Sequence, residues 1–434
     1  MANALRLGVA GLGTVGASVI RLLSQHGDAL ARKNGRAAKV VAVSARDPNR
    51  DRGVDVSGLT WFTDPVALAN SDEIDVFVEL IGGDSGPAED SVRAALSAGK
   101  HVVTANKALL AKHGVELAAL AELNRVSLNY EAAVAGGIPI VKTLRESLSG
   151  NAVNRIYGIM NGTCNYILTR MERDGISFED CLADAQRLGY AEADPSFDIE
   201  GNDTAHKLAI LTSLAFGTKI SADDVYLEGI TSITTADIQA ADELGYRIKL
   251  LGVAQRTDTG IEQRVHPTMV PKHSAIAQVD GVLNAVAVDG DFVGSLVLVG
   301  PGAGGDATAS SVVSDIADLA RGCRTNVLGM PADELADYTR AQMRRHEGGY
   351  YIRFSVHDRP GAFAEIAKAM GNKAISLQSI VQRARAKVAA TDLQSVILIT
   401  HETTEVAVRE ALDEIAASGV ISGVPQMIRI EKLN

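Results

Sequence analysis

The sequence is poor in cysteine and has no long hydrophobic run. Its three cysteines, Cys164, Cys181 and Cys323, lie far apart and form neither a CxxC pair nor an even disulfide set. They offer no thiolate metal site and suit a reducing cytoplasm. Charged residues and glycines interrupt every apolar stretch before it reaches the roughly 18 residues of a membrane span. Because the first residues also lack a signal-peptide layout, we expect a cytoplasmic protein.

The chain also lacks an excess of positive charge. It carries 42 Lys and Arg against 53 Asp and Glu, a formal net charge of −11. Phosphate backbones and anionic membranes repel such a protein, so we expect neither nucleic acid nor membrane as a partner. The 434 residues are 46% hydrophobic and 22% charged, which is typical of a globular enzyme. The length predicts two or three domains.

Strand and helix patterns alternate over the first 130 or so residues. Helical spacing over 14–30, 87–98 and 108–123 separates short apolar or β-branched runs. These runs are 5–10, 39–44, 75–80, 101–104 and 127–131. Alternation of this kind predicts parallel strands with crossover helices, and therefore a doubly wound α/β domain. We assign residues 1–132 to it, joined by 303–322.

The remaining chain is patterned differently. Residues 133–302 combine helices with grouped strands and predict an α+β domain on a mixed sheet. A helix over 311–320 is expected after the glycine-rich run 300–310. The polar, weakly patterned residues 323–348 are interpreted as a linker. Residues 349–434 follow a compact βαββαβ order.

The segment GLGTVG follows the first predicted strand directly and opens a helix. Its glycines, Gly11, Gly13 and Gly16, permit a tight turn, close approach to a pyrophosphate and close packing of the helix. The free N–H groups at the helix start suit an anion. The GxGxxG pattern alone is common, but its place at the start of a βαβ unit favours dinucleotide binding and a Rossmann-like sheet over a plain turn.

The second strand bears on the kind of dinucleotide. An Asp or Glu about twenty residues after the glycines would bind the 2′-hydroxyl of NAD. Here the strand ends in AVSARD, which places Arg46 at or next to that position. Arg46, with Arg50 or Arg52, is suited to the 2′-phosphate of NADP, although a solvated basic loop would have the same sequence. We expect NADP, with NAD as the alternative.

An acidic segment that begins at residue 189 precedes a predicted helix over 203–216, which is apolar on nearly all sides. Asp203 and Lys207 are four residues apart and share a face with buried positions of that helix. A buried ion pair is costly unless compensated, and burial makes lysine an easily tuned acid or base. The residues equally allow Asp203 to be an N-cap with Lys207 as its helical partner.

Two further segments lie at the predicted domain junctions. Lys107, in TANKALL, follows the strand 101–104 at the carboxyl end of the sheet, where ligands bind in such folds. The segment EAAVAGGIPI carries Gly136 and Gly137 between the two domains. Its composition favours a hinge over a site in which carbonyl oxygens hold a hard cation.

Taken in order, these segments resemble homoserine dehydrogenases. The resemblance rests on GLGTVG, TANKALL, EAAVAGGIPI, NGTCNYIL, GYAEADPSFDIEGNDTAHKLAIL and GPGAGGDATASSVVSDI, which span residues 11 to about 317. The tail, with DRPGAFAEIAKAM after a strand, resembles an ACT domain, a ferredoxin-like amino-acid-sensing module. The family usually has Thr where NGTCNYIL has Cys164, which puts a hydroxyl role there in doubt.

The resemblance implies a role for each matching position. Lys207 would be the catalytic lysine, with Lys107 as its partner beside the nicotinamide. The substrate ammonium would lie on Glu192 and Asp203, with Asp198 nearby. The cofactor would be held by Gly11, Gly13, Thr14, Val15, Gly16 and, near the nicotinamide, Gly304. A monovalent cation, in this family often sodium, would bind around Glu131, Val134, Gly136 and Ile138, largely through carbonyl oxygens.

The implied reaction is the reversible oxidation of L-homoserine to L-aspartate 4-semialdehyde, a step of threonine and methionine biosynthesis. The tail would bind threonine as an inhibitor or serve in assembly, and exposed strand edges predict a homo-oligomer, either dimer or tetramer. One alternative is another semialdehyde dehydrogenase, which needs a nucleophilic cysteine such as Cys164. The other is a non-catalytic sensor of dinucleotide and amino acid.

Overall fold

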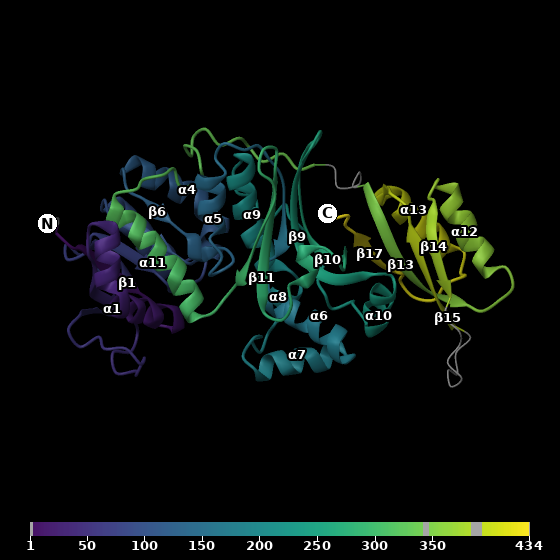
Figure 1. Ribbon diagram of the computed structural model, residues 1–434, viewed down its shortest axis with the longest axis horizontal. Helices are drawn as coiled ribbons and strands as arrows, with labels where there is room; N and C mark the ends of the chain where they lie inside the picture. Colours follow the sequence, from purple (N-terminus) through teal and green to yellow (C-terminus); the bar gives the residue numbers. More distant parts are fainter. Residues whose placement is uncertain (1–2, 342–346, 383–392, 434) are drawn as a thin grey trace.

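The computed structural model describes residues 3–341, 347–382 and 393–433. Three bodies of secondary structure follow one another along its long axis, with the N-terminal body and the tail at opposite ends (Figure 1). No helix within those three ranges is long and apolar enough to cross a membrane.

The first body is a six-stranded parallel sheet in the order β3-β2-β1-β4-β5-β6. The strands are β1 (Leu5–Ala10), β2 (Ala38–Ser44), β3 (Thr60–Phe62), β4 (Val76–Glu79), β5 (His101–Thr104) and β6 (Leu128–Asn129). Its main helices are α1 (Thr14–Asn34), α3 (Pro87–Ser97) and α4 (Lys107–Leu123). This confirms the doubly wound fold. The short β3 and α2 (Pro65–Asn70) had no sequence pattern strong enough to predict them.

A helix from much later in the chain completes this body. α11 (Gly305–Arg321) packs beside α1, as Figure 1 shows, and its Val312, Ile316 and Leu319 join the core around β1. It begins six residues before the predicted start at residue 311. Small residues such as Ala307 and Thr308 look like loop in sequence, but a Cβ on Gly305 would lie 2.8 Å from the Ser18 hydroxyl. Close packing on α1 therefore fixes the helix start.

The second body is a mixed sheet in the order β12-β11-β7-β9-β10. Its strands are β7 (Val153–Ile159), β9 (Tyr246–Thr257), β10 (Gly260–Pro271), β11 (Leu283–Gly290) and β12 (Gly294–Pro301), with the short β8 (Tyr226–Leu227) on β10. Its helices include α6 (Gly162–Asp174), α7 (Phe178–Arg187), α8 (Ser196–Ile199), α9 (Asn202–Phe216) and α10 (Thr235–Glu243). The predicted mixed sheet is confirmed.

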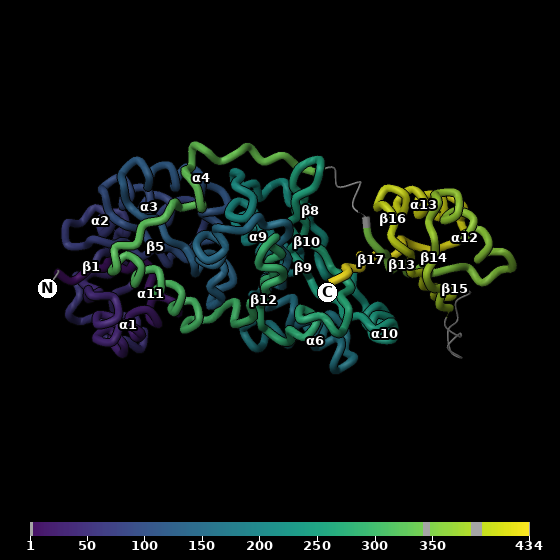
Figure 2. Tube along the Cα trace, turned by 45° about the horizontal axis from the view of Figure 1, so that its top comes forward, coloured from purple at the N-terminus to yellow at the C-terminus, as the bar shows by residue number. Residues whose placement is uncertain are grey.

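The segment after α11 is more closely packed than its polar sequence suggests. Residues 323–341 run from the first body across to the tail (Figure 2). They contain no helix or longer strand, but they bury Val327, Leu328 and Leu335. Isolated bridges join Ala336 to Thr218 and Arg340 to Ile261. The rest of the predicted linker, residues 342–346, lies outside the described residues.

The tail has the predicted βαββαβ order. It consists of β13 (Glu347–His357), α12 (Ala362–Asn372), β14 (Leu377–Gln382), β15 (Leu393–Thr400), α13 (Glu405–Ala417) and β17 (Gln426–Ile430), with the short β16 (Thr403–Thr404) between β15 and α13. Its sheet is not separate from the second body. β17 pairs antiparallel with β13 and parallel with β10, so one sheet continues from the middle of the molecule into the tail.

Candidate active site

The glycine turn lies where the first strand meets the first helix, as predicted. Gly11 has a φ of +96°, and a Cβ there would lie 2.2 Å from the Leu80 carbonyl oxygen. A Cβ on Gly16 would lie 2.1 Å from the Gly11 carbonyl oxygen, whereas Gly13 faces open space. Gly11 and Gly16 therefore allow close approach of neighbouring backbone, and Gly13 leaves space for a ligand.

Two helix N-termini border the same cavity of about 780 Å³. Its lining includes Gly13 and Thr14 at the start of α1 and Gly304 and Asp306 at the start of α11. Unpaired N–H groups and the positive ends of two helix dipoles suit a pyrophosphate. Asp306 forms an ion pair with Arg21 of α1, which holds the two helices together.

A second cavity, of about 770 Å³, continues from the glycine turn to the end of β2. Arg46, Arg50 and Arg52 all line it. Arg46 is exposed, whereas Arg52 lies over the Trp61 ring at 5.3 Å and donates to the Arg50 carbonyl. The arginines that the sequence pointed out thus surround the place where the ribose of a bound dinucleotide would lie.

Three predicted site residues meet at one carboxylate. The Lys207 ammonium donates to Asp203 Oδ2 at 2.7 Å, and the Lys107 ammonium forms an ion pair with Asp203 Oδ1 at 3.1 Å. Asp203 and Lys207 come from the first two turns of α9, and Lys107 is the first residue of α4, which Asn106 caps at 3.1 Å. Only 7% of the Asp203 side chain is exposed, so the two lysines share a buried counter-ion.

Asn161 is a member of the site that sequence reasoning missed. Its side-chain amide donates to both Asp198 Oδ1 and Asp203 Oδ2, each at 2.8 Å. The preceding residue, Met160, offers its carbonyl to Lys207 at 2.6 Å. Asn161 also caps α6 by accepting from the Cys164 N–H at 2.8 Å. An Asn between a strand and a helix is a common N-cap, and that signal could have pointed to it.

The surroundings of Asp198 and Asp203 shift the pKa values of the two carboxyls in opposite directions. Burial would raise the pKa of the Asp203 carboxyl, but Lys207 and Lys107 outweigh burial and hold that pKa well below its ordinary value. Burial raises the pKa of Asp198, and the neighbouring charge of Asp203 raises it further. The site therefore contains one permanent carboxylate next to one that is easier to protonate.

Cys164 has the environment of a packing residue. It is fully buried in α6, and its thiol contacts the Asp198 carbonyl at 3.2 Å. Burial raises the pKa of this thiol well above the ordinary value, and Asp198 adds to the effect. A nucleophilic cysteine needs the opposite shift. The geometry therefore disfavours the alternative that depends on a cysteine nucleophile.

Glu192 is not brought to the other carboxylates. The residue is exposed, and its backbone carbonyl accepts a hydrogen bond from the Gln186 side-chain amide at 3.0 Å. Among the described residues, no hydrogen bond or ion pair of the Glu192 carboxylate is found. In this structure Glu192 therefore makes no contact with the group formed by Asp198, Asp203 and the two lysines, as far as the described residues show.

The glycine-rich segment around Gly136 and Gly137, at the junction of the first two bodies, lies against the segment that returns to the first body at Pro301 and Gly302. The Gly137 N–H donates to the Pro301 carbonyl at 3.0 Å, and a Cβ on Gly136 would lie 2.4 Å from the Gly302 carbonyl oxygen. Glu131 is buried, and its carboxylate accepts the N–H groups of Val141 and Lys142, each at 2.8 Å.

The donors present there limit which ion would fit. Within the described residues, no group of three His, Cys, Asp or Glu side chains is arranged to hold a metal ion. In the segment from Glu131 to Ile138, the carbonyls of Gly136 and Ile138 accept hydrogen bonds from the Ser311 hydroxyl at 2.7 Å and the Ile140 N–H at 2.8 Å, beside the Glu131 carboxylate. A single carboxylate with neutral carbonyl oxygens suits a singly charged cation better than a divalent one.

Comparison with known proteins agrees with this arrangement. A family model described as homoserine dehydrogenase matches residues 139–317, and a model of the NAD binding domain of homoserine dehydrogenase matches residues 11–131. An ACT domain model matches residues 350–417. The chain is 45% identical to a homoserine dehydrogenase of Pseudomonas aeruginosa over 435 residues, which is 99% of each protein.

The chain belongs to the homoserine dehydrogenase family. It is an NAD(P)-dependent oxidoreductase with a C-terminal ACT domain. The crystal structure of a homoserine dehydrogenase from Thiobacillus denitrificans superposes with a TM-score of 0.93 at 43% identity, covering 100% of this chain and 99% of that one. A hyperthermophilic archaeal homoserine dehydrogenase in complex with NADPH covers 75% of this chain and 99% of its own at a TM-score of 0.64 and 26% identity.

Proposed function

We propose that Lys107, Asp203 and Lys207 form the centre at which L-homoserine and L-aspartate 4-semialdehyde are interconverted. The observation that carries this proposal is the shared carboxylate: one buried Asp203 holds two lysine ammonium groups at 3.1 and 2.7 Å. Asp203 and Lys207 are buried and Lys107 is partly exposed; burying charged groups is costly for folding, and such clusters are frequent at catalytic sites.

Each residue takes a separate part in the reaction. The nicotinamide ring, when bound, accepts or donates the hydride. In the direction of oxidation Lys207 acts as the neutral amine, which takes the hydroxyl proton of the substrate as the hydride leaves. In the direction of reduction its ammonium returns that proton to the alkoxide oxygen. Lys107, at the carboxyl end of β5, lies on the cofactor side and adds a second positive charge. Asp203 keeps both ammonium groups aligned, and the Met160 carbonyl fixes the Lys207 ammonium from the other side.

We assign the substrate ammonium to the carboxylates of this region. Asp198 and Asp203 lie on either side of the Asn161 amide, 2.8 Å from it in each case, so a substrate ammonium bound between them would share Asp203 with the two lysines. Glu192, whose side chain is exposed, is assigned to the same role on the strength of the family motif alone.

For the cofactor we propose NADP in preference to NAD. Gly11, Gly13, Thr14, Val15, Gly16 and Gly304 would border the phosphates, and Arg46 would bind the 2′-phosphate. The three arginines around the cavity at the end of β2 support this, since no acidic side chain stands at the position of Arg46. NADPH is present in the archaeal relative.

We also propose a sodium ion in the glycine hinge, held by Glu131, Val134, Gly136 and Ile138, and threonine as an effector of the ACT domain. The carbonyl-rich backbone of the hinge supports the first, and the βαββαβ tail supports the second. β14 is an edge strand of the long sheet, and we propose that it pairs with a second copy of the chain in a homo-oligomer.

Initial rates at 340 nm with L-homoserine test these proposals together. NADP and NAD are compared, sodium is exchanged for a larger cation, and L-threonine is added to parallel samples. The expected result is faster turnover with NADP, loss of rate without sodium and inhibition by threonine. Absence of turnover with either cofactor, in protein shown to be folded, would overturn the assignment of the catalytic centre.

A further inference from the structure

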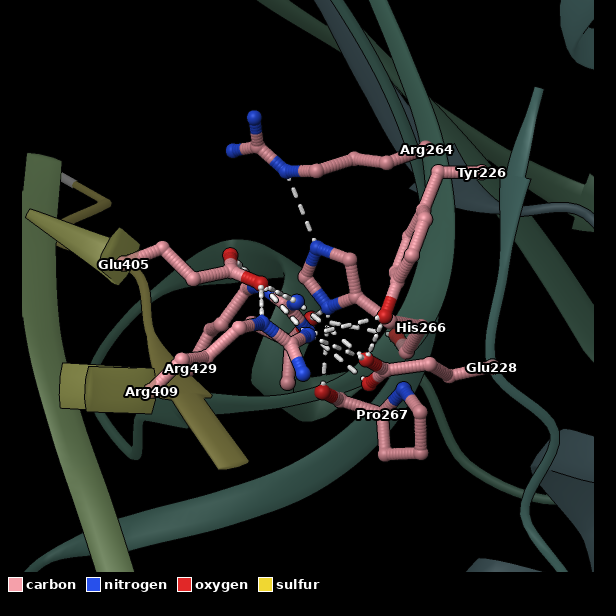
Figure 3. A network of polar contacts seen from close by, with 9 residues as sticks. Tyr226, Glu228, Arg264, His266, Pro267, Glu405, Arg409 and Arg429 are labelled. Atoms are coloured by element: carbon pink, nitrogen blue, oxygen red, sulfur yellow. Dashed lines mark hydrogen bonds and ion pairs between the residues drawn. The ribbon is translucent and has the colours of Figure 1, made fainter. Parts of the chain in front are cut away.

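A buried ionic cluster lies where the tail meets the middle of the molecule (Figure 3). Its centre is Arg429 of β17, which is 1% exposed. The guanidinium donates to Glu405 of α13 through Nε at 3.0 Å and Nη2 at 2.8 Å, and to Glu228 through Nη1 at 2.8 Å. Burial alone would lower the pKa of Arg429, but Glu228 and Glu405 outweigh it and raise that pKa. The arginine is therefore charged and held on two sides.

The two carboxylates belong to different parts of the chain. Glu405 is in the tail, whereas Glu228 directly follows β8 in the second body. The Glu228 N–H donates to the Val265 carbonyl of β10 at 2.8 Å, and the Tyr226 hydroxyl donates to the Glu228 carboxylate. Arg429 thus fixes the side chain of a residue whose backbone is fixed by β10.

The residues after Glu228 support the turn that carries the site aspartates. The Ile230 N–H donates to the Ile199 carbonyl at 2.9 Å. A Cβ on Gly229 would lie 2.6 Å from that same carbonyl oxygen, so the two segments are in direct contact. Asp198 and Asp203 are linked by four residues, Ile199, Glu200, Gly201 and Asn202.

The turn is also enclosed from the side of β10. Gly201 has a φ of +91°, and a Cβ there would lie 2.9 Å from Cγ1 of Val265. Val265 is the residue whose carbonyl binds the Glu228 N–H. Any shift of the segment from β8 to Ile230 therefore presses directly on the backbone between the two aspartates.

A second ion pair between the tail and the second body provides a comparison. Arg353 of β13 donates to Asp237 of α10 at 2.7 Å, and the Tyr351 hydroxyl adds a hydrogen bond to the same carboxylate at 3.0 Å. This contact attaches the tail through α10, which packs on β9 and α6. It joins the same two parts of the chain without passing through Glu228 or the turn.

We propose that Arg429 and Glu228 are positioning residues for the substrate site. The tail supplies Arg429, Arg429 holds Glu228, and the segment after Glu228 holds the turn between Asp198 and Asp203. The inference rests on the proposed function, in which these two aspartates bind the substrate ammonium. It goes further in making the occupancy of that site depend on an arginine in the ACT domain.

Glu228→Ala in the full-length chain is the informative variant. Arg429→Met would leave the buried Glu405 with Arg409 as its remaining cationic partner, whereas the Glu228 side chain is 28% exposed and its removal leaves Arg429 paired with Glu405. The matched control is Arg353→Met, which breaks the ion pair with Asp237 and leaves that carboxylate its hydrogen bonds from the Tyr351 and Thr234 hydroxyls. Glu228→Gln keeps an acceptor for Arg429 and serves as the conservative rescue.

We expect Glu228→Ala to raise KM for L-homoserine about tenfold, because displacement of positioning groups by even an ångström is costly. The Kd for NADP, measured by fluorescence quenching, stays within about twofold, since the nucleotide cavities are not touched. Arg353→Met keeps KM for homoserine within the same margin, and Glu228→Gln recovers most of the loss. If Glu228→Ala and Arg353→Met raised KM for homoserine equally, the proposal would be overturned, because any weakening of the contact between the tail and the second body would then explain the effect.

Amide hydrogen exchange separates this inference from the function on which it rests. In Glu228→Ala we expect the Ile230 amide and the turn 199–203 to exchange about tenfold faster, and no such change in Arg353→Met. Unchanged exchange would overturn the positioning link and leave the assigned site intact. Faster exchange with an unchanged KM would overturn the assignment of Asp198 and Asp203 as ammonium ligands, and this inference with it.

Discussion

Replacing Lys207 by methionine tests the catalytic centre most directly. The substitution keeps the length of the buried side chain but removes two contacts of its ammonium, to Asp203 at 2.7 Å and to the Met160 carbonyl at 2.6 Å. Loss of a general acid–base group lowers turnover by about 10²- to 10⁴-fold, which corresponds to about 3–5 kcal/mol in activation free energy. The fold suffers less. Asp203 keeps Lys107 at 3.1 Å and Asn161 at 2.8 Å, so we expect a loss of about 1–3 kcal/mol in unfolding free energy.

The chain contains a matched control for the loss of a buried lysine. Lys249 is 1% exposed and donates to the Val279 carbonyl at 2.7 Å and to Asn165 at 3.2 Å. Lys249→Met therefore costs stability of similar size but keeps kcat within about threefold. The assay is kcat by initial rates at 340 nm beside urea unfolding of each variant. Near-normal kcat in Lys207→Met, or an equal loss in Lys249→Met, would refute the assignment of Lys207.

Three further predictions concern the cofactor, the substrate and the thiols. Arg46→Ala raises KM for NADP about tenfold and leaves KM for NAD unchanged, because a charge-assisted bond to the 2′-phosphate is lost; an equal effect on both would contradict it. The raised pKa of Asp198 means that its carboxylate is lost, as pH falls, at a higher pH than for a free aspartate. The pH profile of kcat/KM for homoserine therefore has an acid limb that Asp198→Asn lacks, and persistence of that limb in the variant would be evidence against the ammonium site. In thiol labelling followed by intact mass, native protein takes up one label, at the exposed Cys323, and unfolded protein takes up three. Rapid native labelling of Cys164 with loss of activity would revive a cysteine mechanism.

The parts of the fold that could be predicted are those set by local pattern. The strand His101–Thr104 has the predicted bounds because a short β-branched run between two helical patterns leaves little choice. α9 was predicted within one residue, since its apolar periodicity is strong on every side. Asp203 and Lys207 follow from that helix, because spacing of four residues on a buried face brings their side chains together.

The remaining features depend on contacts between distant segments. The start of α11 depends on the close contact of Gly305 with Ser18 of α1, which lies nearly 300 residues earlier in the chain. β17 pairs with β10 through two residue pairs only, Arg429 with Thr268 and Ile430 with Met269. The hydrophobic periodicity of the sequence does not predict this pairing. Arg429 would be judged solvent-exposed from the sequence MIRI, yet partners from elsewhere in the chain bury it. Asn161 was missed for the same reason, because its two aspartate partners come from another segment.

The return of α11 to the first sheet has a consequence for folding. The last strand of that sheet before the chain enters the second body, β6, ends at Asn129, and α11 begins at Gly305, about 175 residues later. At synthesis rates of 5–20 residues per second, roughly 10–35 s pass before Val312 and Ile316 are made and can pack against the apolar surface around Leu7 and Val9. The nucleotide-binding half therefore cannot complete its core as it emerges. During this interval the apolar surface that α11 later covers is exposed, and surface of this kind is prone to aggregation.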